Sequence, residues 1–345
     1  MSGDIRVKHL PEDFLVREST AIRCVSPNDA RYRLYLLRKC GYTTFEAVEW
    51  IAESVGIPQS EVGYCGLKDE DGVTEQVISV PIGLGDPADR LTAAGGDRWM
   101  RFLRYGESAA PLRIGELEGN SFKIVLRNLD PRQGEKGLLA AKKVILYFLN
   151  YFDTQRFGVP GGPKVAHLIG AALSDGQWAK ARELLASSGS GEAAAAREWT
   201  GADADFFAEL DGRVTSFFLA AHASQQWNRT LAEQVEKCLP DARRVDVEGI
   251  GFTYAREVGD CVSVLAAQPA IPITRYTVRD GVVKERRSVR AAVVQTVIEI
   301  DDRRSDEHFP GRMRAELSFF LPSGSYATAA VRQLTTLMSD RDDRT

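Results

Sequence analysis

The chain has 345 residues, of which 44% are hydrophobic and 27% charged, values that are ordinary for a globular protein with a sizeable core. No apolar run approaches the ~20 residues that a membrane helix needs. The N-terminus also lacks the apolar segment of a signal peptide, so we expect a soluble, cytoplasmic protein. The net charge of −4 at pH 7 argues against a nucleic-acid partner unless basic residues gather locally.

The cysteines and histidines do not point to a metal or a disulfide framework. The five cysteines contain no Cys-x-x-Cys pair, and the four histidines contain no His-Glu-x-x-His spacing. Basic residues do gather in three stretches, at 31–39, 98–104 and 284–290. Each stretch is either a solvated face or part of a phosphate-binding groove.

The first half of the chain is predicted to be rich in strands. A helix interrupts them, because the apolar residues of FEAVEWIAESVG recur at helical spacing between Thr44 and the breakers Gly56 and Pro58. The apolar stretch 138–152 is also predicted as a helix. Strands are predicted at residues 5–18, 32–37, 77–80, 98–105, 112–117 and 122–126.

The composition changes at the breaker-rich GVPGGP, residues 158–163. Beyond it we expect short helices at 167–173 and 178–185, a long helix at about 206–238, and strands at 251–254, 262–266 and 293–300. The last segment, LSFFLPSGSYATAAVRQL, predicts strand, turn and helix. Since no regular βαβ alternation is visible, the pattern indicates an α+β fold with a mixed, mainly antiparallel sheet.

The most unusual polar segment is GYCGLKDEDGVTEQVISV, residues 63–80. Lys68 and Asp69 stand between Gly66 and Gly72, ahead of a predicted strand. Polar residues on a turn before a buried strand can point into a cleft, and a neighbouring lysine favours an ionised aspartate. From composition alone, a charged surface loop is the more ordinary interpretation.

This segment resembles the signature of the TruD family of tRNA pseudouridine synthases, Gly-x-Lys-Asp-x-x-Ala-x-Thr-x-Gln. Gly72 stands where the family usually has alanine. The residues that match are Gly66, Lys68, Asp69, Thr74 and Gln76.

Four further segments resemble the same family and follow one another in its order. KHLPEDFLV begins at Lys8, GNSF at Gly119, NYFDTQRFG at Asn150 and LPSGSYATAAVR at Leu321. The resemblance therefore covers nearly the whole chain, although the middle matches less well and Asp153 replaces a usual glycine.

The resemblance implies conversion of a uridine in RNA to pseudouridine, at position 13 of tRNA in the family's known substrate class. It implies no cofactor, no nucleotide loop and no metal. Asp69 would attack C1′ or abstract a proton, two routes that stay open. Lys8 would pair with Asp69 across the cleft and keep it ionised.

Substrate-binding residues are also implied by the resemblance. Phe122 would stack on the flipped-out uracil, with Phe14 as a second aromatic candidate. Asn120 would bind the base or shape its turn. Lys68 and Arg156 are further candidates, and Arg156 would support the cleft wall or contact a phosphate. Either phenylalanine could instead be an ordinary core residue.

The family consists of a catalytic domain with an inserted second domain. We expect residues 1–158 and 308–345 to form the pseudouridine synthase domain and 159–307 the inserted α/β TRUD domain, although the helix around Trp227 could belong to the core. Lys284 to Arg290 would then face the tRNA backbone. A monomer with an RNA substrate and no membrane partner is expected.

Three alternatives stay open at this point. The chain could modify another RNA or tRNA position, or bind RNA without catalysis. A glycosidase with paired carboxylates is a remoter possibility, since Asp69 with Glu70 or Asp71 is too local a pair.

Overall fold

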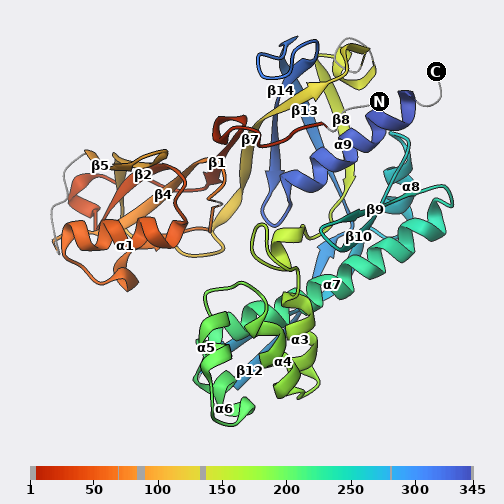
Figure 1. The fold of residues 1–345 in the computed structure, drawn as a ribbon. Helices are drawn as coiled ribbons and strands as arrows, with labels where there is room; N and C mark the ends of the chain where they lie inside the picture. The colour runs from red at the N-terminus through yellow and green to blue at the C-terminus, as the bar shows by residue number, and fades with distance from the viewer. Residues whose placement is uncertain (1–4, 69, 84–89, 133–136, 280–281, 343–345) are drawn as a thin grey trace. The chain divides into compact units, whose positions relative to one another are not determined.

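The computed structural model describes residues 5–68, 70–83, 90–132, 137–279 and 282–342. The chain divides into two compact units (Figure 1). The first unit contains Met1–Ile145 and Thr296–Gly324, and the second contains Leu146–Gln295 and Ser325–Thr345.

The first unit is built on a mixed sheet. Within the described residues this sheet has ten strands in the order β5-β6-β2-β4-β1-β7-β14-β13-β8, with β3 paired to β4. The strands are β1 (Phe14–Thr20), β2 (Tyr32–Cys40), β3 (Gly63–Tyr64), β4 (Val73–Pro81), β5 (Arg90–Gly95), β6 (Arg98–Ser108), β7 (Leu117–Leu129), β8 (Lys143–Leu149), β13 (Val293–Ser305) and β14 (Met313–Pro322). The β1–β4 pair is parallel and β7, for example, is antiparallel to both β1 and β14. The predicted α+β class with a mixed, mainly antiparallel sheet is confirmed.

Helix α1 (Thr44–Val55) covers part of this sheet (Figure 1). Its N-cap is Thr43, and Thr43 and Glu46 form a reciprocal capping box. The helix ends at Gly56, whose φ of 71° is left-handed. Its apolar face packs on Tyr35, Ile78 and Phe102 of the sheet, as the helical spacing predicted.

Two apolar segments were predicted wrongly, and so was the strand at 112–117, of which residues 112–116 lie outside any strand and only Leu117 belongs to β7. Residues 138–152 are not a helix but the short 3-10 helix η4 (Gly137–Ala140) followed by β8. Burial alternates along β8 from Val144 to Leu146, which is the period of a strand. Residues 262–266 lie in helix α8 (Asp260–Ala267) instead of a strand. In both places a short apolar run is compatible with either structure, and the tertiary environment decides.

The second unit is mainly helical. Its helices are α3 (Ala166–Ser174), α4 (Trp178–Ala186), α5 (Ala193–Glu198), α6 (Asp203–Glu209), α7 (Gly212–Cys238), α8 and α9 (Ala327–Asp342). Two hairpins accompany them, β9 (Arg243–Val247) with β10 (Ile250–Tyr254) and β11 (Ala270–Arg279) with β12 (Val282–Ala291). The long helix predicted from residue 206 is divided in two, because Asp211 caps α7 by accepting a hydrogen bond from the Arg213 N–H.

The core of the second unit surrounds Trp227 of α7, which is 2% exposed and packs with Phe152 and Phe252 in one cluster. The predicted domain boundaries and the compact units differ, because residues 146–158 and 325–345 belong to the second unit and residues 296–307 belong to the first. The assignment of 159–307 as an insertion stays a prediction. In the described part of the chain, no helix is long and apolar enough to cross a membrane.

Candidate active site

One row of side chains crosses five strands of the first unit. Lys39 of β2 lies opposite Thr74 of β4, and Thr74 lies opposite Val16 of β1. Val16 in turn lies opposite Phe122 of β7, which lies opposite Phe319 of β14. Directly opposite residues project from the same face of a sheet, so this face carries an ammonium, a hydroxyl and two aromatic rings at one level.

The segment before β4 is anchored on both sides of position 69. The Lys68 N–H donates to Thr44 Oγ1 at 2.9 Å, and the Lys68 carbonyl accepts from Lys39 Nζ at 3.2 Å. On the other side, the Gly41 N–H donates to the Glu70 carbonyl at 3.2 Å. Asp69 itself lies outside the described residues. The carbonyls of its two chain neighbours are thus hydrogen-bonded to the end of β2. The Lys68 carbonyl binds Lys39 of β2, and the Glu70 carbonyl binds Gly41, which directly follows β2.

Gln76 and Gly72 complete the anchoring of this segment. Gln76 Nε2 donates to the Gly66 carbonyl at 3.1 Å, and its Oε1 accepts from Thr44 Oγ1 at 3.0 Å. A Cβ at Gly72 would lie 2.6 Å from the Phe14 carbonyl oxygen. The alanine usual in the family at this position would therefore need a shift of the loop away from β1.

Lys68 does not present a free ammonium to a ligand. Its Nζ lies 2.8 Å from Glu18 Oε1, and the two side chains are 4% and 1% exposed. Glu18 also accepts a hydrogen bond from the Val77 N–H at 3.4 Å. The burial does not fit the predicted role of Lys68 as a substrate-binding residue, since its charge is neutralised beneath the surface. This ion pair instead ties the loop to β1.

The aromatic residues predicted for base stacking lie side by side. The ring centroid of Phe122 is 6.1 Å from that of Phe14 and 5.4 Å from that of Phe319. Phe122 is 8% exposed and Phe14 3% exposed, so both are mainly packed side chains. Lys8 Nζ lies 4.2 Å from the centre of the Phe14 ring, a cation–π contact. The structure therefore brings Lys8, Phe14 and Phe122 together.

Asn120 lies on the same face of β7 as Phe122, two residues away, and opposite Glu18. Its Oδ1 is buried and has no hydrogen-bond partner among the described residues, and the same holds for Thr74 Oγ1. Polar atoms without a partner inside a protein are costly, and at a candidate site they are available to a ligand.

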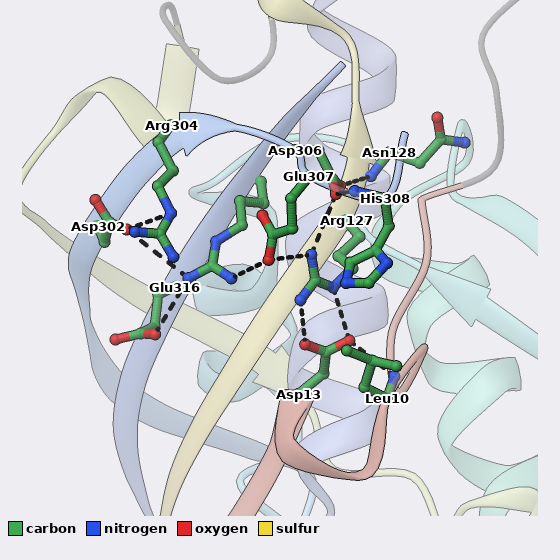
Figure 2. Close-up of polar contacts among 11 residues, drawn as sticks. Leu10, Asp13, Arg127, Asn128, Asp302, Arg304, Asp306, Glu307, His308 and Glu316 are labelled. Carbon is green, nitrogen blue, oxygen red and sulfur yellow. Dashed lines mark hydrogen bonds and ion pairs between the residues drawn. The ribbon is translucent and has the colours of Figure 1, made fainter. Parts of the chain in front are cut away.

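The segment that carries Lys8 is fixed at both ends, and Figure 2 shows the Arg127–Asp13 contacts at one of them. Arg127 of β7 binds Asp13 of the 3-10 helix η1 (Pro11–Asp13) through Nε–Oδ2 and Nη2–Oδ1 contacts of 2.8 and 2.9 Å. The backbone of Arg127 also pairs with that of Arg6 at 2.9 Å in both directions. Lys8 lies between these anchors and has a left-handed φ of 58°.

Arg127 contacts a second carboxylate on its other side, as Figure 2 shows. Its Nη1 lies 3.1 Å from Asp306 Oδ1, and the Arg127 and Asp306 side chains are 3% and 0% exposed. Burial alone would raise the pKa of Asp306, but hydrogen bonds from the Asn128 and His308 N–H groups and from Arg127 hold that pKa below its usual range. The sequence analysis missed Arg127, although a charged residue inside the apolar run of FKIVLRN is a signal of a buried ion pair.

Arg156 belongs to the second unit, at the end of the 3-10 helix η5 (Thr154–Arg156). Its Nε donates to Ser224 Oγ at 3.3 Å, and its guanidinium lies 5.5 Å from the centre of the Phe217 ring. A phosphate contact at Arg156 stays a prediction.

The basic stretch 284–290 lies on β12. Lys284 and Arg286 are exposed and lie opposite Thr277 and Arg275 of β11. Arg290 is enclosed, with its guanidinium 4.0 Å from the centre of the Phe152 ring, and burial lowers the pKa of Arg290 to about 10. The exposed face of this hairpin can attract an anion.

The α+β architecture of this chain is similar to that of a solved structure. The crystal structure of a Methanosarcina mazei protein described as a putative tRNA pseudouridine synthase D is similar with a TM-score of 0.60, at 21% identity over 95% of this chain and 92% of that one. The sequence model of the family "tRNA pseudouridine synthase D (TruD)" matches residues 2–206, more than half of the chain. The chain belongs to the TruD family.

Curated relatives carry the same family name. A Thermus thermophilus protein named tRNA pseudouridine synthase D is 29% identical over 97% of this chain and 89% of its own length. A Geobacter sulfurreducens protein of the same name is 32% identical over 52% of this chain and 42% of its own length. In the latter alignment the chain spans less than half of the relative.

Proposed function

We propose that the protein converts uridine to pseudouridine in tRNA, at position 13, with Asp69 as the catalytic carboxylate. The observation that carries this proposal is the pair of hydrogen bonds that hold Lys68 and Glu70, the chain neighbours of Asp69, at the end of β2. This segment belongs to the unit whose sheet carries Phe122 and Asn120 on one face, and Lys8 contacts the neighbouring Phe14 ring. The names of the relatives support the same substrate class.

The reaction is an isomerisation and needs no cofactor. The N1–C1′ bond breaks, the uracil turns, C5 bonds to C1′, the proton of C5 is lost to a base, and N1 takes up a proton. Asp69 attacks C1′ and later leaves, or it removes a proton in an elimination route. Either route needs the ionised carboxylate. Lys8, held between two anchored positions, favours that form.

The neighbouring groups would bind the base after it leaves its helix. The Phe122 ring stacks on the uracil, supported from behind by Phe319. The Asn120 Oδ1 accepts a hydrogen bond from the uracil N3–H. Lys68 holds the loop through Glu18 and does not contact the substrate.

Binding of the tRNA backbone is assigned to the exposed basic residues of β12 and to Arg156. Phosphate contacts supply most of the affinity of such complexes, which is therefore salt-dependent. An acidic protein can bind RNA in this way, because the local field and not the net charge attracts the phosphates. The proposal includes a monomeric enzyme of the cytoplasm.

The test is pseudouridine mapping by carbodiimide-based primer extension on unmodified tRNAs. Wild-type protein, Asp69→Asn and the control Asp71→Asn are compared, since Asp71 is an exposed carboxylate in the same loop. A new stop at position 13 with wild type and Asp71→Asn, but not with Asp69→Asn, is expected. A stop only in another RNA would show that this RNA, and not tRNA, is the substrate. Tight tRNA binding without any stop would favour a non-catalytic RNA-binding protein.

A further inference from the structure

The first two of the three basic stretches in the sequence come together on one face of the sheet of the first unit. Strands β2 and β6 are antiparallel neighbours, and their register places Arg38 directly opposite Arg101. The chain neighbours of these arginines, Leu37 and Phe102, pack in the apolar cluster beneath α1. Because successive residues of a strand point to opposite faces, the two arginines project from the face that α1 does not cover.

The same level of this face carries two further charged residues. Arg38 lies opposite Glu75 of β4, and Glu75 lies opposite Arg17 of β1. The side chains of Arg17 and Arg38 are 64% and 46% exposed, and Arg101 is exposed as well. Glu75 binds Arg17 and Arg38 with N–O distances of 2.7 and 3.4 Å. Three arginines thus share this level with one glutamate, which leaves an excess of positive charge.

An aromatic ring lies beside the two opposed arginines. Trp99 of β6 projects to the same face as Arg101, which follows it by two residues. The guanidinium carbons of Arg101 and Arg38 lie 5.2 and 5.8 Å from the centre of the Trp99 ring. A cation–π contact orients a guanidinium and leaves its N–H donors available to an anion, whereas an ion pair with a carboxylate occupies them.

The direct opposition of Arg38 and Arg101 requires a compensating interaction. Like charges directly opposite each other on neighbouring strands are destabilising. Glu75 offsets part of this repulsion, although its contact with Arg38 is the longer of its two. Phosphate groups bind guanidinium groups, often through two hydrogen bonds, and bases stack on aromatic side chains. RNA combines both chemistries and therefore fits this surface better than a carboxylate-rich peptide does.

We propose that Arg17, Arg38, Arg101 and Trp99 form a second RNA-contact surface, which binds the tRNA substrate outside the modified uridine. This inference rests on the proposed function, because it takes the tRNA of that reaction as the ligand. The surface is separate from the residues proposed to hold the uracil, since Phe122 projects from the opposite face of the sheet. A large folded RNA can reach both faces around the β5 end of the sheet, from which β6 is the second strand.

The test is a double replacement, Arg38→Gln with Arg101→Gln, in the full-length protein. Glutamine removes the charge and keeps a hydrogen-bond donor. The matched control is Arg104→Gln with Arg304→Gln, which changes the net charge equally. Both control arginines are exposed, lie in the same unit and are paired to a carboxylate. The unfolding temperature, the tRNA affinity at several salt concentrations and the single-turnover rate at saturating protein are measured for each variant.

We expect the double variant to bind tRNA more weakly at low salt. The slope of log K against log salt should be reduced by about 2, one phosphate contact for each lost arginine. The advantage of the wild type in affinity should therefore shrink about tenfold between roughly 50 and 200 mM salt. The rate at saturation should not change, because this surface takes no part in the bond changes. The control pair should keep the wild-type slope.

A third variant, Trp99→Leu, separates the ring from the charges. It keeps both opposed arginines and removes the aromatic surface that orients them. The tRNA affinity should therefore fall about 2- to 5-fold, with the salt slope of the wild type retained. A slope that falls as far as in the double arginine variant would contradict the division of roles between ring and charges.

A folded double variant with the affinity and salt slope of the wild type would overturn the proposal and assign this surface to a partner other than RNA. An equal loss of affinity in the control pair would also contradict it, because the net charge would then account for the effect. If the double variant does not fold, Arg38→Gln and Arg101→Gln are tested singly, each with an expected reduction of the slope by about 1. A wild-type protein that neither binds tRNA nor forms pseudouridine would instead reject the proposed function, and so the two failures are distinguishable.

Discussion

Arg127 and Asp13 form a two-point ion pair across 114 residues of sequence, with contacts of 2.8 and 2.9 Å and both side chains 3% exposed. The pair joins β7, which carries Asn120 and Phe122, to the turn that follows Lys8. Two segments with proposed substrate and catalytic contacts are thereby held in one arrangement. A planar guanidinium suits this task, because it can bind Asp13 and Asp306 at the same time.

Replacement of Arg127 by methionine should strongly destabilise the protein. Removal of the cation leaves the buried carboxylates of Asp13 and Asp306 without their partner, a change that typically costs about 3–5 kcal/mol. Chemical denaturation of full-length protein measures this loss. The control is Arg312→Met, since the Arg312–Asp130 pair is 26% and 42% exposed and should contribute about 0–1 kcal/mol. Equal losses for the two variants would contradict the importance of burial.

Asp69→Ala should abolish pseudouridine formation and leave tRNA affinity nearly unchanged. The carboxylate takes part in the bond changes, whereas phosphate contacts dominate binding. Primer extension measures turnover, and filter binding at several salt concentrations measures affinity. Turnover by the alanine variant would remove Asp69 from the mechanism.

Phe122→Leu should reduce turnover by about 5- to 150-fold, which corresponds to the ~1–3 kcal/mol of a base stacked on an aromatic ring. Leucine keeps an apolar side chain at this 8%-exposed position and limits the loss of stability. Phe102→Leu in β6 is the control, because Phe102 is fully buried and stacks on Trp50, beneath α1. If both variants lose stability and neither loses turnover, Phe122 is only a core residue.

A double variant of Lys284→Ala and Arg286→Ala should weaken tRNA binding, mainly at low salt. Loss of two phosphate contacts should reduce the slope of log K against log salt by about 2. The matched control is Arg213→Ala with Arg244→Ala, two exposed arginines paired to Asp211 and Glu236. An unchanged slope in the β12 variant would place the RNA elsewhere.

His167→Leu should make the protein less sensitive to mild acid. Burial, with help from Arg229 and His222, lowers the pKa of His167 to about 4. The unfolded chain therefore binds a proton below pH 6.5 that the folded chain does not, and stability present above pH 6.5 is lost as the pH falls toward 4. Between pH 7.5 and 5 the wild type should lose about 1 kcal/mol more than the variant, after allowance for partial solvent exposure. Equal losses in denaturant titrations at the two pH values would contradict the shift.

Local patterns predicted those elements whose sequence period is unambiguous. Helix α1 has helical spacing over several turns between clear start and stop signals, and its prediction is confirmed. Residues 138–152 lack such signals, and β8 is a strand because it pairs with β13 in the sheet. That pairing depends on residues about 150 positions later in the chain and is not encoded in the local pattern.

The sequence by itself determined which residue types the site would contain and the segments that carry them, because those segments resemble one family in a fixed order. Lys8, Phe14 and Phe122 were predicted on this basis and lie together. Only the tertiary structure decided which charges are buried and paired. Lys68 is neutralised by Glu18 and Lys39 is enclosed below the loop, because burial depends on strands that are distant in sequence and adjacent in the sheet.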